Sequence, residues 1–305
     1  MMIRQYKHSQ LQTFRGLTAA MMLGLLYQGH ALADPLQASF KPLQPDSKPL
    51  QPNLKPLRLG LLPFLTPSVL IKKFHPMIEY LETTQERPVI VTSAPDFETY
   101  ISRIEQGKYD LFLAAPHISA YTEQHYNSKR LAGFKRQSKG YFVVHKDSNI
   151  YSIKQLKNRT LAMPDPLAII SLLGEWTLVE NSLRLDHDVI RHYTTHDNAL
   201  LLVANGRQDA AVVGVSSFDH ASNRIKSKLR VLTETAVVPH MMFHSRADLT
   251  EPEYQKLKDA MLKFTAQGAG KDFFANAAFG DLTPITDQEI IRLTKLVKLL
   301  EDRLD

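Results

Sequence analysis

The order of apolar and amphipathic segments restricts the possible folds more than any other feature of this sequence. Short apolar runs at residues 57–62, 88–93 and 110–115 are separated by helix-forming segments that begin near Thr66 and Asp96. Buried strands that alternate with helices are typical of a parallel sheet wound with helices. The first part of the chain therefore predicts an α/β unit.

A second series repeats this pattern farther along the chain. Two closely spaced strand-like runs at residues 131–134 and 141–145 precede it, and its helices begin at the pair Asp165-Pro166 and at Thr195. The strands expected in this series cover residues 160–163, 189–193, 210–213 and 229–232. Two successive wound series predict two α/β lobes.

The segment at residues 160–174, T-L-A-M-P-D-P-L-A-I-I-S-L-L-G, joins a strand to a helix through the Asp-Pro pair. Asp165 is a natural N-cap, and Pro166 suits the first helical position. The N-terminus of the helix would then point outward from the carboxyl end of a strand, where ligands bind in open α/β sheets. An ordinary strand-to-helix turn with a good cap fits the same residues.

Proline and capping residues set the expected limits of other helices. Pro76 should interrupt the first helix and restart it, because proline removes an interior hydrogen bond. Thr250 with Glu253 and Thr286 with Glu289 form capping boxes for two helices near the C-terminus. We expect the last helix to pack on the outside of a lobe.

A strand-like run at residues 237–244 is expected to return from the second series toward the first. Two α/β lobes joined by crossing strands form a cleft whose closure can be coupled to a ligand. The expected limits are residues 58–145 with 237–305 for the first lobe and residues 146–236 for the second.

The first 33 residues have the features of a secretory signal peptide. Arg4, Lys7 and Arg15 precede an apolar run of ten residues at 17–26, and the sequence A-L-A at 31–33 fits a cleavage site. The apolar run is shorter than the roughly 20 residues that span a bilayer. We therefore expect export to the periplasm, with an uncleaved anchor as the alternative.

Residues 34–57 repeat the sequence K-P-L-Q-P and are expected to form an extended linker. The whole chain has 37 Lys and Arg against 31 Asp and Glu, and the signal peptide holds three of the basic residues. The near balance that remains, without a basic cluster interleaved with aromatics, excludes nucleic acid as an expected partner. The absence of cysteine from the sequence excludes disulfides, thiolate catalysis and Cys-ligated metals.

Five segments together carry a resemblance to a known protein family. They are L-R-L-G-L-L-P-F from Leu57, D-L-F-L-A-A-P from Asp110, L-K-N-R-T-L-A-M-P-D-P from Leu156, H-D-N-A-L-L-L-V-A-N-G-R-Q-D-A-A from His196 and P-H-M-M-F-H-S-R-A-D-L from Pro239. In order and spacing they resemble the substrate-binding proteins of phosphate/phosphite/phosphonate ABC importers. The resemblance implies an α/β fold of the two-lobed type II periplasmic binding protein class, in which helices wrap a mixed sheet in each lobe.

The resemblance also implies where the ligand binds. The family's site lies in the cleft, at the loops after the first and third strands and at the helix N-terminus after the Asp-Pro pair. Carried over residue by residue, the ligand-binding positions are Phe64, Pro116, His117, Ser119, Ala168, Ile169, Ile170, Ser171, His196, Gly214 and Val215. The resemblance implies no catalytic residue, no metal and no cofactor.

Several of these positions depart from the family's pattern. After the Asp-Pro pair the family has a run rich in Ser and Thr, whereas this chain has L-A-I-I-S at residues 167–171. The family has a Tyr at the position of Phe64 and an aromatic residue at the position of Ser119. At the position of Gly214 it has an acidic residue. One hypothesis is that the ligand has changed, to a less polar molecule or to a smaller anion held by backbone N–H groups alone. The other is that Ser171 and Ser119 still bind an oxyanion.

Other chemistries find less support. His240, Met242 and His244 would share one face of a strand and could suit copper, but half-buried histidines of a crossing strand explain the same pattern. His192 and His196 straddle a strand end and a cap, and His196 is the better candidate for a donor to an anion. No nucleophile elbow, P-loop or GxGxxG motif occurs in the sequence.

We therefore expect a periplasmic, non-enzymatic solute-binding protein that delivers a small ligand to an ABC permease in the inner membrane. An exported module that presents its ligand to a membrane sensor is the first alternative, and the long linker would suit it. A binding protein for a metal or an apolar acid is another, and a hydrolase on an α/β scaffold is the alternative from the catalytic class.

Overall fold

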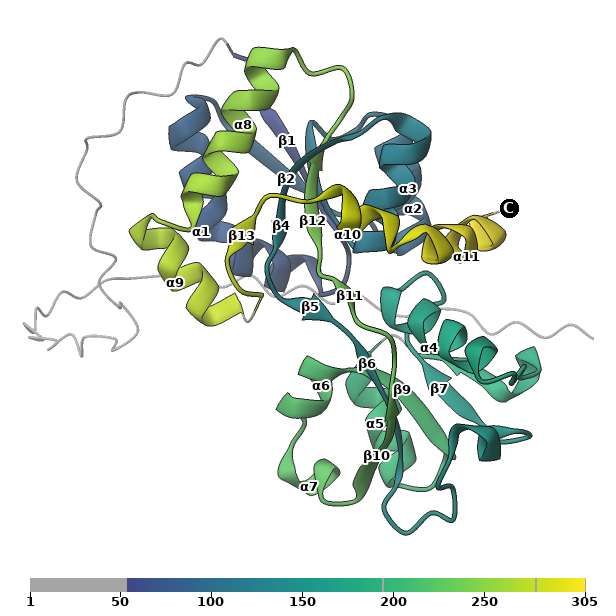
Figure 1. Cartoon of the computed structure of the whole chain (residues 1–305). Coiled ribbons are helices and arrows are strands. Elements are labelled where there is room, and N and C mark those ends of the chain that lie inside the picture. Colours follow the sequence, from purple (N-terminus) through teal and green to yellow (C-terminus); the bar gives the residue numbers. More distant parts are fainter. Residues whose placement is uncertain (1–53, 194, 278, 305) are drawn as a thin grey trace, which may run out of the picture. The chain divides into compact units, whose positions relative to one another are not determined.

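The computed structural model describes residues 54–193, 195–277 and 279–304. The predicted signal peptide and the predicted linker up to residue 53 lie outside the described residues. All described residues belong to one compact unit. Within this unit the strands form two main sheets, which define the two lobes (Figure 1).

Lobe 1 is built on a six-stranded sheet with the strand order β13-β4-β12-β3-β1-β2. Its strands are β1 (Leu57–Leu61), β2 (Val89–Thr92), β3 (Leu111–Ala114), β4 (Lys129–Phe134), β12 (Met242–Ser245) and β13 (Leu282–Thr283). Strand β1 pairs in parallel with β2 and β3, whereas β12 is antiparallel to β3 and β4. The sheet is therefore mixed, with its parallel part where the first wound series was predicted.

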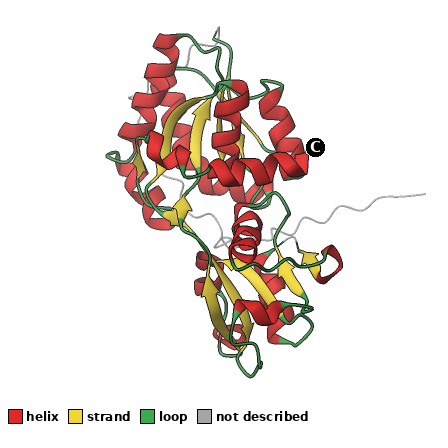
Figure 2. Ribbon diagram, turned by 45° about the vertical axis from the view of Figure 1, so that its right-hand side comes forward, coloured by secondary structure: helices red, strands yellow, loops and turns green. Residues whose placement is uncertain are grey.

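Helices cover both faces of the lobe 1 sheet (Figure 2). One face carries α1, α8 and α9, which contact one another, and the other carries α2, α3 and α11. The helices of this lobe are α1 (Pro67–Gln85), α2 (Phe97–Glu105), α3 (Pro116–Tyr126), α8 (Glu251–Phe264), α9 (Gly268–Ala277), α10 (Asp287–Ile291) and α11 (Thr294–Leu304). Such a buried sheet between two helical layers requires the continuous apolar strands that the sequence contains.

Lobe 2 is built on a five-stranded sheet with the strand order β10-β6-β9-β7-β8. Its strands are β6 (Gly140–His145), β7 (Leu161–Met163), β8 (Ile190–His192), β9 (Ala210–Gly214) and β10 (Leu229–Glu234). Its helices are η1 (Ile153–Leu156), α4 (Ile169–Glu180), η2 (His187–Val189), α5 (His196–Ala204), α6 (Val215–His220) and α7 (Asn223–Lys226). Strand β7 is parallel to β8 and β9, and β6 is antiparallel to β9 and β10, so this sheet is also mixed.

The chain crosses between the lobes twice. It leaves lobe 1 after β4 and returns before β12, and the two crossing segments contain β5 (Gln137–Ser138) and β11 (Val238–Pro239). These short strands pair antiparallel with each other, with Val238 opposite Ser138 and Pro239 opposite Gln137. The predicted returning strand is thus present, divided into β11 and β12.

Strand β6 lies in a different lobe from the one that the sequence limits predict. Residues 141–145 were expected at the end of the first lobe, but β6 pairs along its length with β9 and β10. The chain crosses to lobe 2 in the short β5 segment before Gly140. No sequence pattern in this segment indicates a crossing.

Helix α1 continues through Pro76, so the predicted interruption is wrong. The helix is held on both sides of the proline by buried side chains that face the sheet, namely Leu70, Phe74, Met77 and Leu81. Burial of four apolar side chains on one face outweighs one lost backbone hydrogen bond.

Both predicted capping boxes near the C-terminus are present, at Thr250 with Glu253 and at Thr286 with Glu289. The last helical segment is divided into α10 and α11, and α11 contacts α3 of lobe 1 and α4 of lobe 2. It therefore does not pack simply on the outside of one lobe. In the described residues, every helix is too short or too polar to cross a bilayer.

Candidate ligand site between the lobes

The N-terminus of α3 supplies the lobe 1 part of the candidate site. Strand β3 ends at Ala114, and Pro116 occupies the first helical position, where its missing N–H costs nothing. His117 and Ser119 follow, and both are fully buried. The oxygen Oγ of Ser119 has no hydrogen-bond partner among the residues that the structure describes.

His117 reaches across to lobe 2. Its Nε2 lies 2.9 Å from the carbonyl oxygen of Leu167, and because a carbonyl only accepts, Nε2 donates. Burial, together with the charge of Arg303, lowers the pKa of His117 to about 4. The ring is therefore neutral at pH 7, with its proton on Nε2.

The turn at the Asp-Pro pair has a different form from the one predicted. Asp165 does not cap the helix directly; its Oδ1 accepts from the N–H of Leu167 at 2.8 Å, and Ala168 is the N-cap of α4. The carboxylate closes an Asx turn, which competes with a helix start at Asp-Pro. Helix α4 therefore begins at Ile169, three residues later than a cap at Asp165 and a first turn at Pro166 would place it.

The hydroxyl of Ser171 is already engaged in a hydrogen bond within the turn. Its Oγ donates to the carbonyl oxygen of Pro164 at 3.1 Å, and Nδ1 of His192 donates to the same oxygen at 2.6 Å. The hydroxyl is fully buried and holds the turn together. Ser171 thus stabilises the turn rather than offering a free donor.

Three predicted residues of lobe 2 lie together. The backbone N–H of Gly214, at the end of β9, donates to Nδ1 of His196 at 3.4 Å. A Cβ added at Gly214 would lie 3.8 Å from both the His196 ring and Ile170. Because Nδ1 accepts, the proton of the neutral ring is on Nε2, and burial keeps the pKa of His196 below its ordinary value. His196 therefore presents an N–H donor. Val215 is the first residue of α6, next to Gly214.

Phe64 contributes an apolar surface rather than a polar group. It follows β1 and is partly buried, and its ring lies edge-on to Phe279 with 6.1 Å between ring centroids. Phe279 also lies under the ammonium group of Lys73, 4.9 Å from the ring centroid. Among the described residues, no hydrogen bond joins Phe64 to the candidate residues of lobe 2.

Several helices that begin near the candidate positions lack side-chain caps. In the described part of the chain no side chain caps α1, α3 or α4, whose N-cap residues are Thr66, Ala115 and Ala168. By contrast, Asp96 caps α2 and Thr195 caps α5. The first N–H groups of a helix have no intrahelical partner, and they carry the positive end of its dipole. Uncapped N-termini can therefore receive an anion.

Helix α11 joins the two lobes near this turn, a feature that the sequence did not predict. Arg303 donates to the carbonyl oxygen of Pro166 and pairs with Glu175 of α4. Lys295 lies over the ring of Trp176, 5.2 Å from its centroid. These contacts link residues more than a hundred positions apart, so no local sequence pattern could have indicated them.

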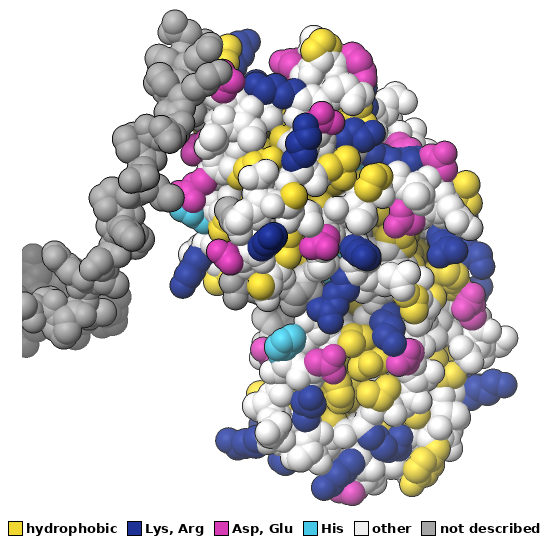
Figure 3. Space-filling view, turned by 60° about the vertical axis from the view of Figure 1, so that its left-hand side comes forward, with side chains coloured by type: hydrophobic (Ala, Val, Ile, Leu, Met, Phe, Trp, Pro, Cys, Tyr) yellow, Lys and Arg dark blue, Asp and Glu magenta, His cyan; other side chains and the backbone are white. Residues whose placement is uncertain are grey.

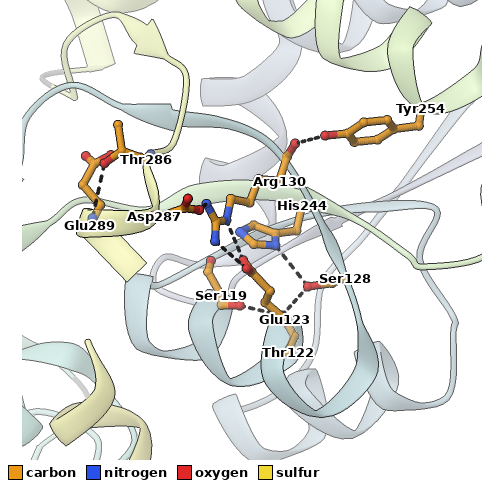
Figure 4. A network of polar contacts seen from close by, with 10 residues as sticks. All are labelled: Ser119, Thr122, Glu123, Ser128, Arg130, His244, Tyr254, Thr286, Asp287 and Glu289. Atoms are coloured by element: carbon orange, nitrogen blue, oxygen red, sulfur yellow. Dashed lines mark hydrogen bonds and ion pairs between the residues drawn. The ribbon is translucent and has the colours of Figure 1, made fainter. Parts of the chain in front are cut away.

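A polar network inside lobe 1 extends to Ser119, whose carbonyl oxygen accepts from Thr122 Oγ1 at 3.0 Å (Figure 4). Ser128 Oγ is 3.0 Å from both Thr122 Oγ1 and Nδ1 of His244. The His244 ring stacks on Phe112, and burial lowers its pKa to about 3. The described residues contain no group of three or more His, Cys, Asp or Glu side chains that could hold a metal ion.

A cavity of about 360 Å³ lies beside the outer part of this network. Arg130 on its wall binds Glu123 at 2.5 and 2.7 Å and Asp287 at 2.6 Å, and its carbonyl accepts from the hydroxyl of Tyr254 (Figure 4). Its charge is therefore already neutralised. None of the predicted ligand-binding residues lines this cavity.

A second cavity, of about 620 Å³, adjoins the crossing segment after β4. Lys135, Arg136 and Lys271 line it together with a single carboxylate, Asp281. Figure 3 shows several Lys and Arg side chains close to one another where the two lobes meet on this face. This part of the surface is therefore basic.

Comparison with known proteins identifies a family and a fold for this chain. A family model described as "ABC transporter, phosphonate, periplasmic substrate-binding protein" matches residues 59–290. Among solved structures, the chain is similar to a Xanthomonas citri protein bound to chloride ion, with a TM-score of 0.72 and 20% sequence identity over 81% of this chain and 98% of that one.

Two further solved structures are similar over most of the chain. PhnD1 from Prochlorococcus marinus, in complex with methylphosphonate, has a TM-score of 0.69 and 18% identity over 80% of this chain and 98% of its own. A binding protein component of an ABC phosphonate transporter from Pseudomonas aeruginosa has a TM-score of 0.68 and 17% identity over 82% and 87%. At such identities the likeness establishes the fold, and it confirms the predicted two-lobed periplasmic binding protein architecture.

Proposed function

The chain belongs to the periplasmic substrate-binding proteins of phosphonate ABC transporters, and we propose that it holds a small oxyanion of the phosphonate class between its lobes. The observation that carries this proposal is the meeting of two uncapped helix N-termini from different lobes. His117, at the second position of α3, bonds to Leu167, which directly precedes the N-cap of α4. Within this proposal, the first N–H groups of both helices and their two positive dipole ends bind the same anion.

The side chains around this volume favour an anion without an attached ammonium group. His196 offers its Nε2–H as a donor, and the proposed positions include no Asp or Glu that could bind a cation. Ser119 Oγ, buried and without a partner in the described chain, is a further donor. The oxyanion would therefore be held mainly by backbone N–H groups, with few hydroxyls. This supports the smaller-anion hypothesis more than a metal or an apolar acid.

The ligands of the similar structures support the anionic class. The Prochlorococcus protein was solved with methylphosphonate, and the Xanthomonas protein was solved with chloride ion and with ATP. All three are anions, although the proteins share only 18 to 20% identity with this chain. Within the proposal the protein is non-enzymatic, is exported by the signal at residues 1–33 and delivers its ligand to an inner-membrane permease. The alternative of a membrane sensor as the partner rests on the linker alone.

A single substitution at the N-cap of α4 tests the site. Ala168→Asp would place a carboxylate where the anion is proposed, and Asp is among the best N-cap residues, worth roughly 0.5 to 2 kcal/mol over Ala. We expect the variant to be as stable as the parent or more stable, and to lose methylphosphonate binding in isothermal titration calorimetry.

The matched control is Val179→Asp, which adds the same charge at an exposed position near the other end of the same helix. It should bind methylphosphonate like the parent. Unchanged affinity in Ala168→Asp would contradict the proposed site, and absence of binding to the parent protein by methylphosphonate, phosphite and phosphate alike would contradict the proposed ligand class.

A further inference from the structure

The hydrogen bond between the lobes fixes which nitrogen of His117 carries the proton. The carbonyl of Leu167 can only accept, so Nε2 is protonated and donates. In a neutral ring Nδ1 then holds a lone pair and can only accept. His117 is fully buried, and its Nδ1 has no hydrogen-bond partner among the described residues.

The surroundings of this ring disfavour its cationic form. Arg303 of α11 is the charged group that acts on it, and the effect of that cation is to lower the pKa of His117. Arg303 is itself held by Glu175 and by the carbonyl of Pro166, so it stays near the ring. Burial acts in the same direction.

A buried acceptor without a donor costs free energy until a partner supplies one. His117 is the second residue of α3, the helix whose first N–H groups the proposed function assigns to the oxyanion. We propose that His117 Nδ1 accepts a hydrogen bond from the ligand, so that the site selects oxyanions that carry a P–OH group. This inference rests on the proposed function and adds a specificity-determining residue to it.

The chemistry of two small ligands separates them at this atom. Methylphosphonate as a monoanion has one P–OH and two further oxygens, so it can donate to Nδ1 and accept from the helix N–H groups. Methanesulfonate has nearly the same shape, but its three oxygens carry no proton at neutral pH. One of them would oppose the lone pair of Nδ1. The loss of one buried hydrogen bond predicts a preference for the phosphonate of about 10- to 100-fold.

Calorimetric titration of the full chain with both ligands at pH 6.5 tests this preference, and two substitutions separate the roles of the two ring nitrogens. His117→Gln places an amide donor near the position of Nε2 and keeps the bond to Leu167, but it removes the acceptor at Nδ1. His117→Asn places its amide oxygen near the position of Nδ1. We expect the preference to fall to within about threefold in the Gln variant and to persist in the Asn variant. His75→Gln, at an exposed histidine of α1, is the matched control.

A second readout is the pH profile of affinity. Affinity for methylphosphonate should fall as pH rises through the ligand's second ionisation, where P–OH is lost, and this fall should be absent in the Gln variant. Equal affinities for the two ligands in the parent would overturn the inference and leave the proposed anion site standing, as would an unchanged preference in His117→Gln. If neither ligand binds, the proposed function and this inference both fail.

Discussion

At some positions of this chain, closely packed neighbouring atoms limit which residue type can be accommodated. Gly60, in the middle of β1, is the clearest case, because a Cβ added there would lie 2.7 Å from two ring atoms of Tyr109. Tyr109 is buried and its ring lies against Tyr100, with 5.3 Å between centroids. The ring is therefore confined, and β1 can take no side chain at this position.

We predict that Gly60→Ala destabilises the protein by about 1 to 3 kcal/mol, the usual cost of overpacking a core. Urea unfolding followed by circular dichroism would measure it. Gly268→Ala is the control, since no atom lies within 4 Å of a Cβ at that helical position. Equal stability of the Gly60 variant and the parent would mean that Tyr109 can move.

Buried histidines should make the stability depend on pH. Burial lowers the pKa of His117 and His240 to about 4 and that of His244 to about 3. In the unfolded chain these rings titrate near pH 6.5. Between pH 6.5 and about 4 the unfolded state thus binds more protons than the folded state, and the free energy of unfolding rises with pH.

We therefore predict that the urea midpoint falls as pH is lowered from 7 to 4.5 and changes little between pH 7 and 8. Each such histidine contributes up to about 1.4 kcal/mol per pH unit within this window. His244→Asn, whose side-chain amide can still donate to Ser128, should reduce the slope by one proton. A slope that is the same in this variant would show that His244 titrates normally.

Among the helices, α11 has the most consequential position, because it contacts an element of each lobe. Its ion pair from Arg303 to Glu175 and its bond to the Pro166 carbonyl attach it to α4 and to the turn before α4. On the lobe 1 side, Glu301 of the same helix lies 2.7 Å from Nε2 of His125. The helix therefore couples the turn of lobe 2 to α3.

We predict that Arg303→Ala increases amide hydrogen exchange at residues 164–172 by about threefold to thirtyfold, the effect of a partly buried ion pair. Exchange in α8 should be unchanged and serves as the internal reference. Arg303→Lys, which keeps the charge but cannot bind in the bidentate manner of Arg, should give an intermediate value. Equal protection in all three proteins would contradict the coupling.

The elements of this fold were largely predictable, and their packing partners were not. Apolar runs and capping boxes are local signals, so β1, β3, β7 and the caps at Asp96 and Thr286 could be read directly. The prediction of a helix break at Pro76 is wrong because whether a proline breaks a helix depends on how much of the surrounding helix face is buried. The start of α4 was misread because an Asx turn and an N-cap use the same residue type.

The sequence indicates which loops to consider for the candidate site, but not the contacts that their residues make. The family's pattern indicates the loops at Pro116 and Ala168, yet the geometry that gives them meaning is the bond from His117 to Leu167 over 50 positions. Whether Ser171 faces a ligand or its own turn depends on the neighbouring His192, which also binds Pro164. Such choices between partners are made by tertiary structure.

At the scale of the whole molecule, charge near the crossing segments should affect how fast a ligand arrives. Lys135, Arg136 and Lys271 line one cavity there, with Asp281 as the only acidic residue on its wall. A cluster of like charge raises the local concentration of an oppositely charged ligand, and salt screens the effect.

We predict that the double substitution Lys135→Gln and Lys271→Gln lowers the association rate constant of methylphosphonate about two- to fivefold at low ionic strength. The dissociation rate constant should stay the same, and the difference should vanish in high salt. Stopped-flow fluorescence of Trp176 would follow the binding. The same exchange at Lys256 and Lys298, which are exposed elsewhere on lobe 1, is the charge-matched control. A slower dissociation without a change in association would exclude steering.

The pairing of β5 with β11 limits how the two lobes can move. Among residues 54–304 as far as the structure describes them, the chain passes between the lobes through these two segments, which are hydrogen-bonded to each other. Neither can bend without the other, so the lobes are expected to swing about one axis and not to twist or slide independently. Binding of a small ligand between the lobes would then change one quantity, the angle between the two lobes. A membrane partner that contacts both lobes could respond to that angle alone, without contacting the ligand.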